Sequence, residues 1–173
     1  MSSGLLVLQL FLCSISTSIS NVPIGFPANI VVQAQLRLAI ARLWEGSPTF
    51  RAQCLKIGEH KTYRVAVTIE PSLALTRSWR AQCVLRVYSS GLVAARVMVP
   101  LNRQVDELIP HELEHIVEHI DGVDVKRNAA KHGGGAYDAG RGQIETVRAV
   151  HAGRQARDEM AASREAVALL SRR

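Results

Sequence analysis

Three histidines and four acidic side chains lie within the thirteen residues 110–122, PHELEHIVEHIDG. Read from its first histidine, the segment contains the pattern H-E-x-x-H, and read four residues later it contains H-x-x-E-H. Histidines four apart on a helix differ by about 40° around its axis, so they project side by side from adjacent turns. Two imidazoles need this spacing to bind one zinc ion, so the segment predicts a metal site in one of two registers.

In the first register, His111 and His115 are the metal ligands and Glu112 is the general base. Glu112 lies about 100° round the helix from His111, which brings its carboxylate within reach of a water molecule on the metal. In H-E-x-x-H hydrolases this carboxylate takes a proton from the water while the metal polarises a carbonyl group. The first register therefore predicts hydrolytic chemistry with Glu112 as the catalytic residue.

In the inverted register, His115 and His119 bind the metal and Glu118 is the base. The three histidines together span about 12 Å along a straight helix, so they cannot all bind one ion. His119 immediately precedes the expected helix end at 121–122, where fraying makes a poor rigid ligand and where the helix dipole favours an imidazolium. We therefore favour the first register and interpret His119 as a helix-end histidine.

The helix that carries these histidines is expected to extend over residues 107–120. Gly122 can end it in a left-handed conformation, and Pro110 falls in its first turn, where proline is tolerated. The alternative to a metal site is a solvated helix face on which His and Glu side chains form pairs. One side carries the apolar stripe of a core-packing helix, formed by Ile109, Leu113, Ile116, Val117 and Ile120. The histidines are therefore expected to face a cleft.

A catalytic zinc site usually has three protein ligands and one open position for water. Asp121 and Asp124 are so close to the histidines in sequence that only a sharp reversal of the chain could bring them to the metal. Glu145 lies about thirty residues after His115, near the start of a second helix expected from about residue 143. The downstream candidates for the third ligand are Asp121, Asp124, His132, Asp138, Glu145 and His151.

An H-E-x-x-H helix followed by a helix with a glutamate resembles the gluzincin branch of zinc metallopeptidases. The resemblance covers roughly residues 51–160, and only the first motif is specific. The sequence departs from the thermolysin type at Ala149, where an aspartate would follow the glutamate ligand by four residues. The resemblance implies zinc as the cofactor, Glu112 as the catalytic residue, and His111, His115 and Glu145 as the metal ligands.

The same resemblance implies a peptide or protein substrate. In compact gluzincins the strand before the active helix lines the substrate cleft, which here corresponds to residues 92–99. A substrate peptide could add to that edge through main-chain hydrogen bonds. Gluzincins also commonly use a Tyr or His to stabilise an oxyanion. Tyr137 and His132, which flank the glycines at 133–135, are candidates for this role.

The rest of the chain predicts an α+β fold in a single domain over residues 21–173. Residues 28–44 have apolar side chains at helical spacing and predict an N-terminal helix. Four short runs rich in Val, Ile and Tyr predict a sheet of about four mostly antiparallel strands. With the two later helices, this order resembles the compact gluzincin core, so the resemblance implies a zincin-like core. The four runs are 51–57, 62–70, 80–88 and 92–100.

Cys54 and Cys83 each end a copy of the tetrapeptide Arg-Ala-Gln-Cys, and each copy opens an expected hairpin. An exported chain favours a disulfide between them. The first and third strands of a plain meander lie nearly 10 Å apart, however, which is too far for the bond. A disulfide requires the two strands to be neighbours, and two ordinary buried cysteines are the equal alternative.

Residues 1–20 carry no charged side chain and resemble a secretory signal peptide. Their apolar run is too short to span a bilayer, which takes about 20 residues, so no stable membrane insertion is expected. We expect an exported protein, periplasmic or secreted. The net charge of +6 could mark nucleic-acid binding. The basic residues of the C-terminal third, however, accompany a single aromatic, Tyr137, so no stacking platform is visible and no nucleic-acid partner is expected.

The leading hypothesis from the sequence is a zinc-dependent hydrolase, namely a metallopeptidase with Glu112 as general base. A different class of protein would use the same ligands without turnover, as a zinc-stabilised binding or scaffold protein. The small size of the chain and the lack of a visible substrate-binding domain favour this alternative. A basic nucleic-acid-associated protein is the third hypothesis, and export to a compartment without nucleic acid would exclude it.

Overall fold

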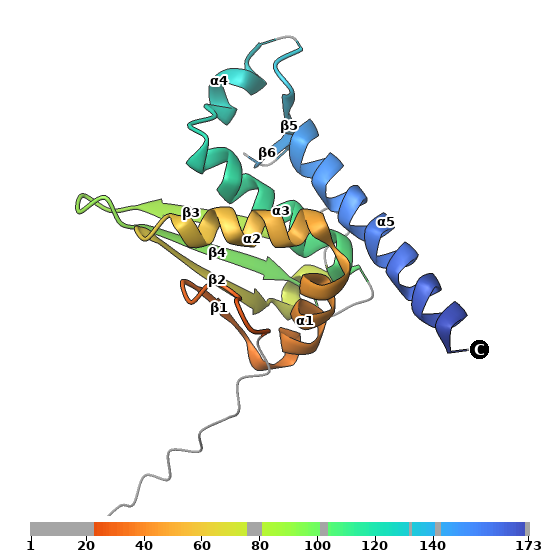
Figure 1. Ribbon diagram of the computed structural model, residues 1–173. Helices are drawn as coiled ribbons and strands as arrows, with labels where there is room; N and C mark the ends of the chain where they lie inside the picture. The colour runs from red at the N-terminus through yellow and green to blue at the C-terminus, as the bar shows by residue number, and fades with distance from the viewer. Residues whose placement is uncertain (1–22, 76–80, 101–103, 132, 141–142, 172–173) are drawn as a thin grey trace, which may run out of the picture.

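The computed structural model describes residues 23–75, 81–100, 104–131, 133–140 and 143–171 (Figure 1). Helices combine with a four-stranded sheet and a separate two-stranded sheet. The expected α+β class is therefore confirmed. The signal peptide expected at residues 1–20 lies outside the described residues.

The larger sheet contains four strands, as expected, but their directions differ from the expectation. β1, β2 and β4 run parallel, and only β3 is antiparallel, to β4. This sheet is therefore mixed rather than mostly antiparallel. Two helices connect β1 to β2, and such a helical crossover returns the chain in the same direction. The order across the sheet is β1 (Ile30–Val32), β2 (Tyr63–Ile69), β4 (Val93–Val99) and β3 (Gln82–Val87).

Residues 51–57, which the sequence predicts as a strand, lie instead in helix α2 (Pro48–Glu59). Phe50, Cys54 and Ile57 are completely buried, and their spacing of four and then three residues is helical. These three side chains therefore lie on the face of α2 that packs into the core. The first Arg-Ala-Gln-Cys tetrapeptide is helical and the second leads into β3, so the two copies do not share a structure.

The helix expected over residues 28–44 begins later in the structure, at Arg37. Ile30–Val32 forms β1, and a 3-10 turn leads from it to helix α1 (Arg37–Gly46). Ile30 lies opposite Val65 of β2, so the first strand exists through pairing with a partner far along the sequence. A local helical period does not reveal such a partner.

The histidine-bearing helix is α3 (Val105–Ile120), which confirms the helix expected over 107–120. It begins two residues earlier than expected, so Pro110 lies inside the helix rather than in its first turn. The side-chain amide of Gln53 donates to the carbonyl of Pro110 at 2.9 Å. Gly122 ends this region in the left-handed conformation, with φ of 71°.

Helices α1, α2 and α3 pack against one face of the larger sheet. Alternate side chains of a strand point to opposite faces, and β2 and β4 each show this alternation of burial. Figure 1 shows α2 and α3 lying together on the same side of the sheet. The buried strand side chains that form the core with these helices include Ile30, Val32, Val65, Val67, Val93, Ala95, Val97 and Val99.

The second expected helix begins later than residue 143. Residues Gln143–Thr146 form strand β6, paired antiparallel with β5 (Ala136–Gly140), and helix α5 (Val147–Leu170) follows. The hydroxyl of Thr146 caps this helix by accepting a hydrogen bond from the N–H of Ala149 at 3.0 Å. Glu145 therefore lies on a strand, two residues before the helix that was expected to carry it. A short helix, α4 (Val125–Ala129), precedes this hairpin.

Cys54 and Cys83 are both free thiols. Cys54 is buried on α2, and Cys83 is partly buried on β3. The two cysteines are therefore not on neighbouring strands, as a disulfide between two hairpins would require. Among the helices of the described residues, none is both long enough and apolar enough to cross a membrane.

Helix α5 crosses α3 closely at Gly153. A Cβ atom at this position would lie 2.8 Å from the carbonyl oxygen of Glu107 and 3.0 Å from Cβ of His111. The first distance is shorter than real Cβ contacts allow, and the clashing atom belongs to the backbone of α3. Further along α5, the carboxylate of Glu159 accepts hydrogen bonds from the hydroxyls of Ser47 and Thr49, at 2.6 and 2.7 Å. These contacts fix α5 against α3 and against the start of α2.

We expect Gly153→Ala to destabilise the protein by about 1–3 kcal/mol, because the added methyl group overpacks the contact between α5 and α3. The same change in an unconstrained helix interior would stabilise it by about 1 kcal/mol. Chemical denaturation measures the difference, and Ala161→Gly at an exposed position of α5 calibrates the intrinsic helix propensity. A stabilised Gly153→Ala variant would show that the close contact is not a constraint.

Candidate metal centre

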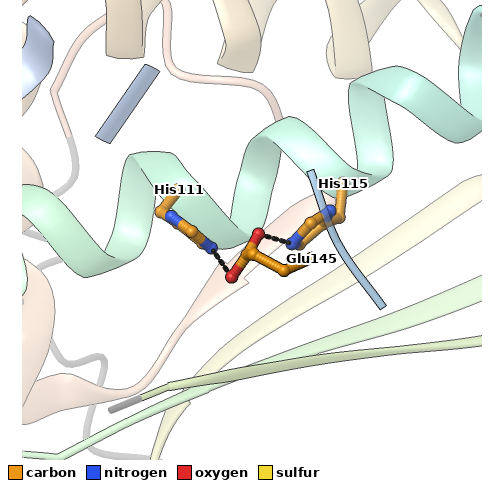
Figure 2. A group of neighbouring side chains, drawn as sticks. All are labelled: His111, His115 and Glu145. Atoms are coloured by element: carbon orange, nitrogen blue, oxygen red, sulfur yellow. Dashed lines mark hydrogen bonds and ion pairs between the residues drawn. The ribbon is translucent and has the colours of Figure 1, made fainter. Parts of the chain in front are cut away.

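The side chains of His111, His115 and Glu145 converge between α3 and β6 (Figure 2). Each residue offers one ligand atom, and these atoms lie within 4.8 Å of one another. Oε2 of Glu145 lies 3.0 Å from Nε2 of His111, and Oε1 lies 3.4 Å from Nε2 of His115. The three residues that the sequence predicts as metal ligands are thus brought together, and this cluster can bind a metal ion.

Two elements position this cluster from opposite sides. Helix α3 presents the two histidines on adjacent turns, with ring centroids 5.3 Å apart. Strand β6 brings Glu145 between the two rings, and its two oxygens point to different histidines (Figure 2). Both rings turn Nε2 toward the carboxylate, so an ion at this point would bind the histidines through Nε2. The Nδ1 atoms remain available for other partners.

The other candidates for the third ligand lie outside this cluster. Asp121 is held in ion pairs with Lys56 and Arg148. Asp124 instead caps α4 by accepting a hydrogen bond from the N–H of Arg127. Also outside the cluster are Asp138, whose carboxylate accepts from the N–H of Gly140, and His151, which is exposed on α5; His132 lies outside the described residues.

The pKa values of the cluster show that it attracts positive charge. Burial alone raises the pKa of Glu145, but its hydrogen bonds to His111 and His115 outweigh burial and hold the pKa far below its usual range. Burial alone lowers the pKa of His115, but hydrogen bonds to Glu118 and Glu145 raise it to about 10. A bound cation would replace the proton on His115, so metal binding and proton binding compete at this site.

Glu112 lies beside the cluster in a nearly dry environment. Glu112 is only 5% exposed, and the backbone N–H of Cys83 lies close enough to lower the pKa of its carboxylate. Burial is the main cause that raises the pKa of Glu112 to about 7, and the charge of Glu145 adds to it, whereas His111 and His115 lower it. A carboxylate with this pKa can both accept and release a proton near neutral pH.

A cavity of about 300 Å³ opens beside Glu112, His115 and Glu145. Strand β3 forms one wall, and β6 together with the residues around α4 forms another. The sequence predicted residues 92–99 as the strand that lines the cleft, but β4 lies inside the sheet between β2 and β3. The edge strand is β3. The remaining lining residues are Ala81, Gln82, Cys83, Leu85, His119, Val123, Val125, Ala139, Gln143 and Ile144.

Glu118, the base of the inverted register, supports a ligand of the first register instead. Its Oε2 lies 3.1 Å from Nδ1 of His115, and the side chain is only 2% exposed. Metal-binding histidines commonly donate their second ring N–H to a carboxylate, which fixes the tautomer and the ring orientation. The bond to Glu118 therefore leaves Nε2 of His115 free to face the cluster. The two overlapping motifs describe one site.

His119 has a partner of its own at the end of α3. Its Nδ1 lies 2.7 Å from the hydroxyl of Tyr63 on β2, and its ring packs edge-on against the Tyr63 ring. His119 lines the cavity but is exposed and is not one of the three clustered ligands. The sequence interpretation of His119 as a helix-end histidine agrees with this position.

An ion-pair network behind the cluster was not expected from the sequence. Arg148, in the first turn of α5, binds Glu114 of α3 and Asp121 at the end of that helix. Gln53 of α2 donates to the same Glu114 at 2.6 Å. The network ties the start of α5 to α3, which fixes the distance between Glu145 and the histidines. The sequence offers little indication of this network, because nothing in it distinguishes Arg148 from the other arginines of the C-terminal third.

Tyr137 lies directly opposite Glu145 in the pairing of β5 with β6. Residues directly opposite in an antiparallel ladder point to the same face, so the phenol lies on the cluster side of the hairpin. Burial and the negative charge of Glu145 raise the pKa of Tyr137 above its usual value, and Arg154 partly opposes them. The hydroxyl therefore stays protonated at neutral pH and can donate a hydrogen bond.

The two registers make opposite predictions for zinc binding. We expect His111→Ala to abolish stoichiometric zinc binding, because it removes a ligand, whereas His119→Ala leaves zinc bound. Zinc analysis of the purified, dialysed variants measures the result. Zinc lost from His119→Ala but retained by His111→Ala would instead establish the inverted register.

We expect Glu118→Gln to weaken zinc binding by about 10–100-fold, because the amide is a weaker partner for the N–H of His115 than the carboxylate. Competition with a chelator measures the affinity, and Glu59→Gln at an exposed acidic position on α2 is the control. Equal affinities in the Glu118→Gln variant and the wild type would exclude a role for Glu118 in positioning the ligand.

No protein-family model, curated protein or solved structure matches this chain.

Proposed function

We propose that the protein is a zinc-dependent hydrolase that cleaves peptide bonds. The observation that carries the proposal is a cluster of two imidazoles and one carboxylate, with a buried carboxylate beside it in a cavity. His111, His115 and Glu145 would hold the metal, and Glu112 would act on the water. The arrangement leaves one side of the cluster open to the cavity, as a catalytic site requires.

The ligand set favours zinc over other divalent ions. Two imidazole nitrogens with one carboxylate oxygen are a recurrent catalytic zinc set, whereas magnesium and calcium prefer oxygen ligands alone. The donor atoms already converge within 4.8 Å, so little movement would be needed to bind an ion. When bound, zinc would supply a Lewis acid that polarises the substrate carbonyl and makes a water molecule more acidic.

Glu112 would take the proton from the attacking water and pass it to the leaving nitrogen. Its position supports this role, because the carboxylate lies in the cavity next to His115. Cys83 of the edge strand lines the same cavity, and its backbone N–H lowers the pKa of this carboxylate. The base therefore lies beside the proposed substrate wall.

The substrate would be an extended peptide that pairs with β3. Among the described strands, β3 pairs only with β4, so its other main-chain edge could take a further strand. Aliphatic residues of the cavity, including Leu85, Val123 and Ile144, would accommodate apolar side chains of the substrate. Tyr137 would donate its hydroxyl to the developing oxyanion.

The order of elements supports a zincin-like core as part of this proposal. A mixed sheet with one antiparallel edge strand precedes the H-E-x-x-H helix, and a glutamate follows that helix. This order is similar to that of minimal gluzincins.

Glu112→Gln separates an enzyme from a zinc-stabilised binding protein. We expect the variant to keep its zinc and to lose at least about 100-fold in peptide hydrolysis, because the amide cannot accept the proton. Hydrolysis of a quenched fluorescent peptide library measures the activity, and Glu59→Gln is the matched exposed control. Stoichiometric zinc with no hydrolysis by the wild type would favour the binding protein, and absence of zinc would reject both.

A further inference from the structure

The face of the larger sheet opposite the helices carries an unusual set of side chains. None of the described helices packs on it, since α1, α2 and α3 all contribute to the core on the other face. Parallel strands usually have both faces covered, whereas the described part of the chain covers only one face of β1, β2 and β4. We call this surface the open face.

Three arginines of the open face surround a floor of alanines. Arg64 of β2 and Arg86 of β3 both lie directly opposite Ala94 of the central strand β4. Arg96 lies two residues further along β4, on the same face, between Ala66 of β2 and Val84 of β3. The register therefore places one arginine on each of three adjacent strands around the short side chain of Ala94.

The spacing of the strands brings these arginines within reach of one small ligand. Neighbouring strands lie about 4.8 Å apart, so Arg64 and Arg86 are about 10 Å apart across Ala94, and Arg96 is about 7 Å along β4. Arginine side chains are long enough to converge over that distance. The alanines leave a hollow of about 470 Å³, which Val31 and Tyr88 also line.

The positive charge of the open face has little compensation. No Asp or Glu is among the described residues that line the hollow. Within the described chain, the hydrogen bonds of Arg64 go to the carbonyls of Lys61 and Tyr63, and its Nη1 alone makes them. Glu70 lies close enough to feel the charge of Arg96, but its hydrogen bonds go to Ser72. Most guanidinium donors are thus available to a ligand.

From this arrangement we infer that the open face binds a phosphate group. A phosphate carries up to two negative charges and three acceptor oxygens, and arginine forks bind it through paired hydrogen bonds. Tyr88 is the single aromatic among the residues that line the hollow, so the stacking platform of a nucleic-acid surface is missing. The apolar walls formed by Val31, Val84 and Tyr88 fit an organic phosphate whose carbon part contacts them.

This site is independent of the proposed metal centre. The cluster lies on the helix side, whereas the three arginines project from the opposite face of the same sheet. The open face would therefore bind its ligand whether or not the protein hydrolyses peptides. Strand β3 is shared by both sites, since Arg86 faces the hollow and Cys83 and Leu85 line the cavity.

The test is a calorimetric titration of the full-length chain with pyrophosphate, which offers the proposed phosphate chemistry. Pyrophosphate also binds zinc, so the titration is repeated in the His111→Ala background. We expect saturable binding that Arg86→Ala and Arg96→Ala each weaken about tenfold, as the loss of a charge-assisted hydrogen bond predicts. Ala94→Glu, which places a carboxylate opposite both Arg64 and Arg86, is expected to abolish binding without lowering the melting temperature.

Arg42→Ala is the matched control, because it removes one charge from an exposed position on α1. Equal weakening by Arg42→Ala and Arg86→Ala, or no saturable binding by the wild type, overturns the proposal. Flotation with phosphatidylcholine vesicles, with and without phosphatidylglycerol, identifies the source of the phosphate. Vesicle binding that requires both phosphatidylglycerol and Arg86 indicates a lipid headgroup, and pyrophosphate binding alone indicates a soluble ligand.

Discussion

The contact between α3 and α5 is the constraint on which the metal cluster depends. The histidines belong to α3, and Glu145 lies immediately before α5, so the packing of these two helices sets the distance between the ligands. Gly153 permits the close crossing beside His111, and Arg148 joins the start of α5 to Glu114. A shift of α5 along α3 would separate the carboxylate from the imidazoles.

The same contact explains the positions of three arginines in the C-terminal third of the chain. Along α5, three arginines form ion pairs with acids of α3, which places opposite charges on the two facing surfaces. Buried or half-buried carboxylates are stable only when they are paired or hydrogen-bonded. These three arginines therefore pair within the molecule, unlike those of the open face. The three pairs are Arg148 with Glu114, Arg157 with Glu107, and Arg164 with Asp106.

Three glutamates of α3 point in different directions and therefore contact different parts of the molecule. Glu112 points toward β3 and the cavity, Glu114 toward α2 and α5, and Glu118 back along the helix to His115. Successive residues of a helix differ by about 100°, so neighbouring acids can serve a substrate site, an interface and a ligand. The overlap of two zinc motifs in one segment reflects this division, because the second glutamate orients a histidine of the first motif.

The sequence was sufficient to predict those features that depend only on the spacing or composition of residues within one helix or strand. The pairing of His111 with His115 follows from the helical period, and the strands near 62–70, 80–88 and 92–100 follow from their composition. Glu145 could be named as a candidate because it lies at a suitable distance downstream. The position of Glu145 on a strand could not be predicted, since β6 forms only by pairing with β5.

Tertiary structure decided what depends on partners that are distant in sequence. Residues 51–57 lie in α2, where Phe50, Cys54 and Ile57 face a core that the local pattern does not describe. Strand β1 forms because it pairs with the edge of β2. The parallel pairing of β1 with β2 goes with the two helices, α1 and α2, that connect these strands. By itself, the sequence determined which side chains could bind a metal. Only the packing of α5 on α3 decided that they meet, because a ligand cluster depends on contacts between elements, whereas periodicity describes one element at a time.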